Sequence, residues 1–285
     1  MKVKKALVWL IPALTLGFGG LGAVLYGRFL RTAMEADTAL LTPGRAETYI
    51  LVAVVAAAAA ILAALAWLAR GKYPDSYGHC FYAPNPLPLA AAVIAGGLVT
   101  AAGILAAMGY ITLADRQLSR MVLGVMLIPA GVVMEEIARR NFRGEAQKSR
   151  LSGLLLVPGY AACVWLVYAY QTHTANPVVL DYVFLLLGIM AAILAFYYQA
   201  SFSFDRPKPV RAIWTAAVAV VLLLTAMGHG EDAMTMCLSG GVSLYLLCQM
   251  TVLLYRGVHP ADLAPLKLPG GETDGETPDY TNEMR

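Results

Sequence analysis

The sequence predicts an all-α membrane protein, a bundle of about eight transmembrane helices. Hydrophobic residues make up 59% of its 285 positions and charged residues only 14%, whereas soluble domains carry about 25% charged residues. The apolar residues also gather in runs of about twenty, the length that a helix needs to cross a hydrocarbon core of about 30 Å. Because these runs are continuously apolar and do not alternate, they predict helices and not barrel strands.

Eight spans follow from this pattern in chain order. The first follows Lys2, Lys4 and Lys5; it is longer than the apolar region of a signal peptide and lacks a small-residue cleavage site, so we predict a retained helix. The fourth shares a short hairpin with the third and ends on two glutamates. The predicted spans are Ala6–Tyr26, Thr48–Leu68, Leu87–Leu113, Leu118–Ala138, Leu151–Tyr170, Val179–Gln199, Val210–Gly228 and Met234–Tyr255.

The distribution of lysine and arginine predicts the orientation, because cytoplasmic loops of membrane proteins are enriched in both. With the N-terminus inside, 16 of the 21 lysines and arginines fall in inner segments. The outer segments hold Arg28, Arg31, Arg45, Arg116 and Arg120. Missing or adding one span would move every later segment to the other side and erase this bias. Both termini are therefore expected in the cytoplasm, and the chain in the inner (cell) membrane.

The domain organisation is expected to be simple. Residues 1–256 form one transmembrane helical domain, in which the basic loop from Arg139 to Arg150 separates two candidate halves, 1–138 and 151–256. No convincing sequence repeat relates these halves. Residues 257–285 hold six acidic residues and are too polar to bury a core, so a disordered acidic cytoplasmic tail is expected.

Composition also excludes or disfavours several classes of function. The net charge is only +3, and no basic cluster has the size or aromatic content of a nucleic-acid surface. The four cysteines form no C-x-x-C pair, so neither a zinc site nor a redox motif is predicted. The middle of every span lacks Asp, Glu, Lys, Arg and His, which disfavours a proton relay and haem ligation. No cofactor is expected, and the predicted partners are the lipid bilayer and a membrane or cytoplasmic protein.

The sharpest motif is the segment from Glu135 to Arg140, which reads E-E-x-x-x-R. It resembles the first motif of the CAAX-processing-type intramembrane proteases, a family in which glutamates and later histidines activate water within the membrane. The resemblance covers six residues. It implies a catalytic site that includes Glu135, Glu136 and Arg140.

The later histidines of such a site would be His173 and His229. Neither lies in the F-x-x-x-H or H-x-x-x-N context of that family, and both are predicted at the outer face, away from the glutamates. The same motif also places each glutamate four residues before Arg139 or Arg140, an order that favours helix-surface ion pairs of about 0.3–0.5 kcal/mol each.

Two predicted helices contain proline. Pro129 in the fourth span and Pro158 in the fifth are expected to kink the chain, and broken helices line the central sites of many transporters. Tyr160 and Tyr245 are predicted near the same depth. These four residues are candidate ligand contacts, with packing kinks as the alternative because proline is frequent in spanning helices.

The inner loop from Gly71 to Pro86 concentrates aromatic residues around His79 and Cys80. Functional residues often lie on loops, so these two residues are candidates for docking a partner or ligand. The alternative is a loop at headgroup level whose aromatic residues lie in the membrane interface.

The outer loops carry a further candidate site. His229, Glu231 and Asp232 follow the seventh span, and His173 and Asp181 lie in the preceding outer loop. Such side chains attract divalent cations when they meet. Solvated loop residues are the alternative interpretation.

Three functions are therefore compatible with the sequence. The uncharged span centres favour a non-enzymatic membrane subunit, carrier or small-molecule sensor. The glutamate motif alone favours an intramembrane protease, and the two proline-containing helices favour a proton-independent permease.

Overall fold

The computed structural model confirms the all-helical prediction and the number of spans. It describes residues 2–32, 46–71, 73, 77–112, 117–144, 148–173, 182–204, 206–230 and 232–258. Within these ranges there is no strand, and eight helices are long and apolar enough to cross a membrane. They are α1 (Lys2–Thr32), α2 (Ala46–Leu68), α4 (Pro86–Thr112), α5 (Leu118–Arg143), α6 (Lys148–His173), α7 (Val183–Ser201), α8 (Pro209–Met227) and α9 (Ala233–Val258).

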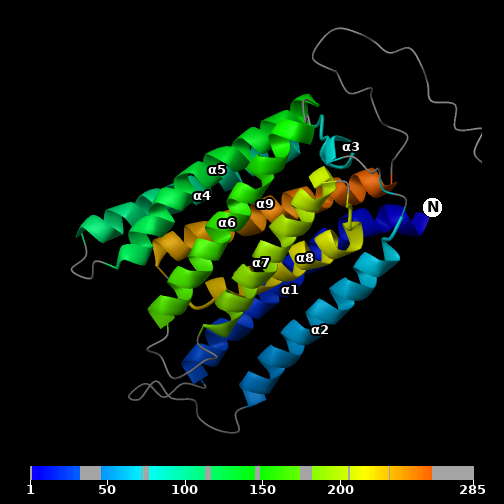
Figure 1. The fold of residues 1–285 in the computed structure, drawn as a ribbon. Helices are drawn as coiled ribbons and strands as arrows, with labels where there is room; N and C mark the ends of the chain where they lie inside the picture. The colour runs from blue at the N-terminus through cyan, green and yellow to red at the C-terminus, as the bar shows by residue number, and fades with distance from the viewer. Residues whose placement is uncertain are drawn as a thin grey trace, which may run out of the picture.

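Two short elements complete the described part. The five-residue helix α3 (Tyr77–Phe81) lies between α2 and α4, and the 3-10 turn η2 (Phe202–Phe204) follows α7. Consecutive long helices run in opposite directions, so α1 begins and α9 ends at the same end of the bundle, near α3 (Figure 1). We call this the α3 end, and the other the opposite end.

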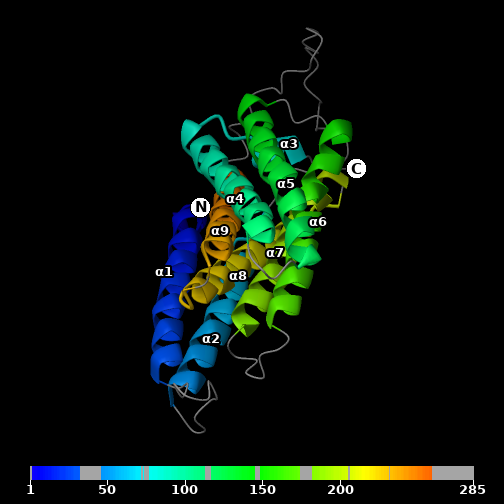
Figure 2. The same ribbon diagram turned by 90° about the vertical axis from the view of Figure 1, so that its left-hand side faces the viewer.

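The eight long helices pack as one bundle. Helix α9 contacts α1, α4 and α8, while α8 also contacts α1, α2 and α7. Figure 2 shows α9 between α1 and α4. The contacts of α1 with α8 and of α4 with α9 cross the boundary between the two candidate halves, so these halves interlock.

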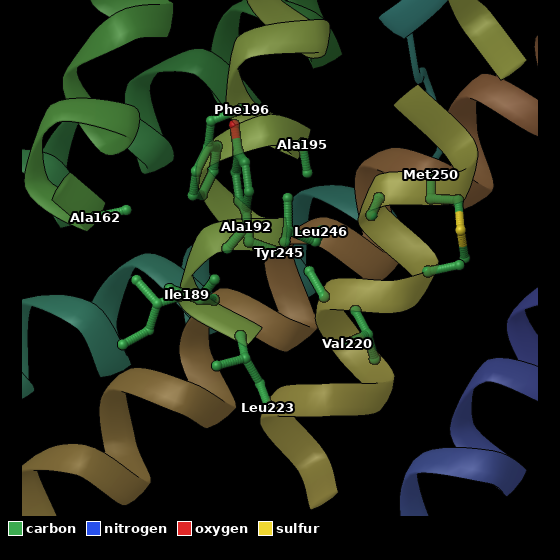
Figure 3. Close-up of a cluster of buried hydrophobic side chains, with 14 of the residues drawn as sticks. Ala162, Ile189, Ala192, Ala195, Phe196, Val220, Leu223, Tyr245, Leu246 and Met250 are labelled. Atoms are coloured by element: carbon green, nitrogen blue, oxygen red, sulfur yellow. The ribbon is translucent and has the colours of Figure 1, made fainter. Parts of the chain in front are cut away.

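Helices α6 to α9 share a tightly packed apolar core (Figure 3). Ala162 of α6, Phe196 of α7, Leu223 of α8 and Tyr245 of α9 are all buried there. The rings of Phe196 and Tyr245 lie 6.1 Å apart between centroids. Dispersion contacts of this kind hold membrane helices together, because lipid tails are as apolar as the side chains.

Small residues let several helices approach at the backbone. A Cβ atom on Gly124 would lie 2.8 Å from the Gly103 carbonyl oxygen, and one on Gly241 would lie 2.9 Å from that of Ala95. The α4–α5 and α4–α9 contacts therefore depend on glycine. The tight approach also explains why α4 pairs so extensively with both neighbours.

Candidate functional site

The two glutamates of the E-E-x-x-x-R motif are paired with arginines of the same helix. Glu135 Oε2 lies 3.3 Å from Arg139 Nη2, and Glu136 Oε1 lies 2.8 Å from Arg140 Nε. Both are i,i+4 pairs on α5, in the geometry that the spacing predicts. The aliphatic part of Glu135 also packs over Gly96 of α4, where a Cβ atom would lie 2.6 Å from its Cγ.

The structure does not bring these glutamates close to the histidines of the protease hypothesis. Glu135 lies 17 residues beyond Leu118, so it is about 25 Å along α5 from the opposite end. His173 ends α6 and His229 follows α8, both at that opposite end. The described residues therefore do not assemble a glutamate–histidine pair.

The proline and tyrosine candidates face different surroundings. On α5, Pro129 is exposed, whereas Pro158 of α6 is buried. Tyr160 is 64% exposed and Tyr245 only 2%. These four residues do not converge on a common space.

The interior of the bundle is filled where the two proline-containing helices meet. Pro158 lines a space of about 10 Å³ together with residues of α4, α5, α7 and α9, among them Phe196 and Leu238. That volume is about the room of one water molecule. Within the described residues, this central space is too small for a substrate.

Helix α3, in the loop that holds His79 and Cys80, packs against the bundle with most of its residues buried. The Cys80 side chain is fully buried, while His79 is half-buried. Tyr77 stacks on Phe81 with ring centroids 4.6 Å apart, and its hydroxyl accepts a hydrogen bond of 3.4 Å from Asn141 Nδ2 of α5. Three of the five α3 side chains thus belong to the core.

The residues flanking α3 are fixed in the same way. Arg256 of α9 donates from Nε to the Tyr82 carbonyl oxygen at 2.8 Å, and its guanidinium lies 5.1 Å from the centre of the Tyr82 ring. Gly144, with φ of 73°, ends α5 beneath the same ring. Ala83 N donates to the Asn141 carbonyl oxygen at 3.2 Å. The α2–α4 connection therefore ties α5 to α9.

Burial at this end changes the acidity of two phenols. Desolvation of the phenolate raises the pKa of Tyr73 to about 12. Burial likewise raises the pKa of Tyr77 well above its ordinary value, although the hydrogen bond with Asn141 opposes this shift. Both hydroxyls therefore remain protonated, and act as neutral hydrogen-bonding groups, at physiological pH.

At the opposite end, the described residues of the candidate acidic site make separate contacts. Asp232 Oδ2 lies 3.5 Å from Arg120 Nη2 of α5, and Asp232 Oδ1 accepts a hydrogen bond from Thr235 N, which caps α9. The ring of His229 stacks on Tyr26.

Of the other members of that candidate site, the structure describes only His173. His173 stacks on Tyr182 with centroids 5.4 Å apart, and Glu231 and Asp181 lie outside the described residues. No group of three or more potential metal ligands occurs in the part of the chain that the structure describes.

A hollow lies between α5 and α6 at the opposite end, where the sequence indicated no site. It has a volume of about 640 Å³. Gln117, Ser119 and Gln171 supply its polar lining, and Leu118, Val122, Val164 and Val167 its apolar lining. We call this hollow the α5–α6 groove.

A second hollow is wholly different in character. It has a volume of about 280 Å³ and is bounded by α2, α7 and α8. Its lining consists of apolar side chains, such as Val55, Phe184 and Val218. Trp214 of α8 donates from Nε1 to the Ala59 carbonyl oxygen at 3.2 Å and holds α2 nearby. A purely apolar hollow at membrane depth provides no group that selects a ligand.

Comparison of the chain with models of protein families, with curated proteins and with solved structures finds no match. The candidate site therefore rests on the geometry of this chain alone.

Proposed function

We propose that this protein is a non-enzymatic multi-pass membrane protein that senses a membrane amphiphile, which it binds in the α5–α6 groove. The observation that carries the proposal is the combination of size and lining in this groove. Its volume of about 640 Å³ falls within the range of about 300–1,000 Å³ typical of small-molecule sites.

The lining supports an amphiphile in one orientation. Gln117 and Ser119 lie at the start of α5, and Gln171 near the end of α6, so the polar groups gather near the helix ends. The valine walls lie deeper along both helices. A polar head would bind the amide and hydroxyl groups at the interface, and its hydrocarbon part would contact the valines.

The chemistry of the head follows from the uncharged side chains that form the described part of this lining. The polar groups named in it are amides and a hydroxyl, which donate and accept hydrogen bonds without a net charge. An uncharged head rich in hydroxyl or amide groups therefore suits the groove better than a phosphate monoester. Burying an unpaired charge against valine would be costly.

Sensing is favoured over transport. The groove opens laterally beside α5 and α6, while the central space next to Pro158 measures only about 10 Å³. A ligand in the groove would occupy one depth of the membrane. The i,i+4 pairing of Glu135 and Glu136 favours a structural role for these residues over proteolysis.

The charge distribution completes the proposal. We infer an inner-membrane location with both termini in the cytoplasm, since 16 of the 21 lysines and arginines then lie inside. The α5–α6 groove then faces the outer leaflet, and α3 lies at the cytoplasmic face. A partner protein that receives the signal would meet the α3 end.

The test is to fill the groove and measure what remains bound. Val122→Trp and Val164→Trp place large rings in it, whereas Val132→Trp places the same ring on an exposed position of α5 outside its lining. Native mass spectrometry of purified protein should show an amphiphile whose occupancy falls at least about tenfold in the first two variants. Val132→Trp should retain it. Equal retention in all three variants, or no bound amphiphile in the unmodified protein, would contradict the proposal.

A further inference from the structure

The α3 end carries cations that have no carboxylate partner among the described residues. Arg143 ends α5, Arg206 and Lys208 lie between η2 and α8, and Arg211 lies in the first turn of α8. All four side chains are exposed. The described ion pairs at this end use Arg139 and Arg140 instead. We call these four residues the basic rim.

The members of the basic rim belong to neighbouring elements. The turn η2 contacts both α6 and α7. Ser203 of η2 hydrogen-bonds with Ser152 in the first turns of α6, which places η2 beside the corner where α5 gives way to α6. Arg143 precedes that corner, and Arg206 follows η2 closely in the chain.

The segment after α9 has the opposite charge. Residues 259–285 contain six aspartates and glutamates and two basic residues, and five of the six acidic residues fall within 272–283. In contrast, the segments that the sequence assigns to the inner side between residues 1 and 258 hold fourteen lysines and arginines and five aspartates and glutamates. The acidic segment therefore begins at the end of the bundle with the largest excess of positive charge.

We propose that the acidic segment 272–283 docks on the basic rim of its own chain and covers it. Thirteen residues connect Val258 with Glu272, enough for an end-to-end distance of about 20 Å as a random coil and about 45 Å when extended. Helix α9 packs directly against α8, so the first turn of α8 lies within this reach.

Because the acidic segment is tethered to the bundle, weak contacts are sufficient to hold it on the basic rim. Each exposed ion pair contributes little by itself, but a segment on a short linker has an effective concentration of the order of millimolar at its site. The interaction is expected to be electrostatic and to weaken as salt shortens the Debye length. Anionic lipid headgroups would compete for the same cations.

Photo-crosslinking of the full chain in discs of neutral phosphatidylcholine tests this docking. With p-benzoylphenylalanine at Tyr280, crosslinked peptides should contain residues 139–150 or 204–211 at about 50 mM KCl. The yield should fall at least about fivefold at about 500 mM KCl, where screening is strong. A variant that neutralises the acidic segment (E272Q, D274N, E276Q, D279N and E283Q) should lose the crosslinks to the same extent.

Two matched variants serve as controls. Substitution of three uncharged residues of the same segment (T273A, T277A and T281A) should leave the yield unchanged. Arg206→Gln with Lys208→Gln should lower it, whereas Arg28→Gln with Arg31→Gln, which removes two exposed arginines at the opposite end, should not.

Three results would overturn the proposal. Crosslinks that persist at high salt or in the neutralised variant would show docking by apolar contacts. Crosslinks to no bundle residue would show that the segment stays away from the basic rim. If the acidic segment gives no crosslink in neutral discs and the basic rim retains anionic lipid, lipid headgroups are the occupant of the rim.

Discussion

Individual glycines differ sharply in what their missing side chain allows. In α1, a Cβ atom on Gly22 would collide with the Thr225 hydroxyl of α8, and one on Gly19 would lie 2.7 Å from Leu224 Cδ1. Gly17 and Gly20 of the same helix have no such neighbour within 4 Å. Of these four glycines, Gly19 and Gly22 thus mediate the α1–α8 contact, a difference that the shared residue type does not reveal.

This difference predicts opposite effects for one substitution in one helix. Gly22→Ala should lower the free energy of unfolding by about 1–3 kcal/mol, because it overpacks a close helix contact. Gly20→Ala should leave it unchanged or raise it slightly, since alanine favours helix more than glycine does. Reversible unfolding in mixed micelles measures both. Equal destabilisation by the two substitutions would contradict the contact assigned to Gly22.

At the scale of the helix, the glutamate motif of α5 allows a direct test of its role. If Glu135 and Glu136 act as surface partners of Arg139 and Arg140, replacing both glutamates by glutamine should cost less than about 1 kcal/mol. Exchanging the four charges, with arginine at 135 and 136 and glutamate at 139 and 140, should restore most of that loss. Unfolding in micelles measures each variant.

A catalytic role would give another pattern. Glu135→Gln would then abolish a proteolytic activity and leave stability intact or raise it, and the exchanged charges would restore no activity. A stability loss above about 2 kcal/mol would show instead that the carboxylates hold more than these two pairs.

The position of each spanning helix along the chain was predictable, whereas its buried face was not. Hydropathy located all eight spans, since a run of apolar residues is costly to leave in water. It did not distinguish exposed Pro129 from buried Pro158, or Tyr160 from Tyr245. A lipid-facing side chain and a core side chain of a membrane helix are equally apolar, so sequence carries little signal of rotation about the axis.

The burial of α3 could not be predicted from the sequence either. Its aromatic residues match those of an interfacial loop, and the distinction lies in contacts distant in sequence. Tyr77 meets Asn141, and Tyr82 meets Arg256. The α5–α6 groove depends in the same way on how two helices pack against each other, which no local pattern reports. The only sequence signal that could have indicated this groove is the pair of glutamines in its lining, Gln117 and Gln171.

At the scale of the whole molecule, the orientation is the property that labelling can decide. A cysteine replacing Arg206 at the α3 end should resist a membrane-impermeant maleimide in intact cells and react after permeabilisation. A cysteine replacing Arg31 at the opposite end should react in intact cells. This contrast follows from the excess of lysine and arginine at the α3 end. The reverse pattern would invert the proposed topology and place the α5–α6 groove in the inner leaflet.

The ion pairs near the two ends of α5 have a consequence for the choice of membrane. Arg120 pairs with Asp232 near one end of α5, and Arg139 pairs with Glu135 near the other. The nineteen residues from Arg120 to Arg139 correspond to about 28 Å of helix, which is close to the thickness of a typical hydrocarbon core. A thicker bilayer would draw one pair below the headgroups, and a thinner one would leave apolar turns in water. Hydrophobic mismatch of this kind costs fractions of a kcal/mol per ångström and sorts proteins among membranes of different thickness. The spacing of these charges along α5 thus matches the hydrocarbon thickness of an ordinary bilayer.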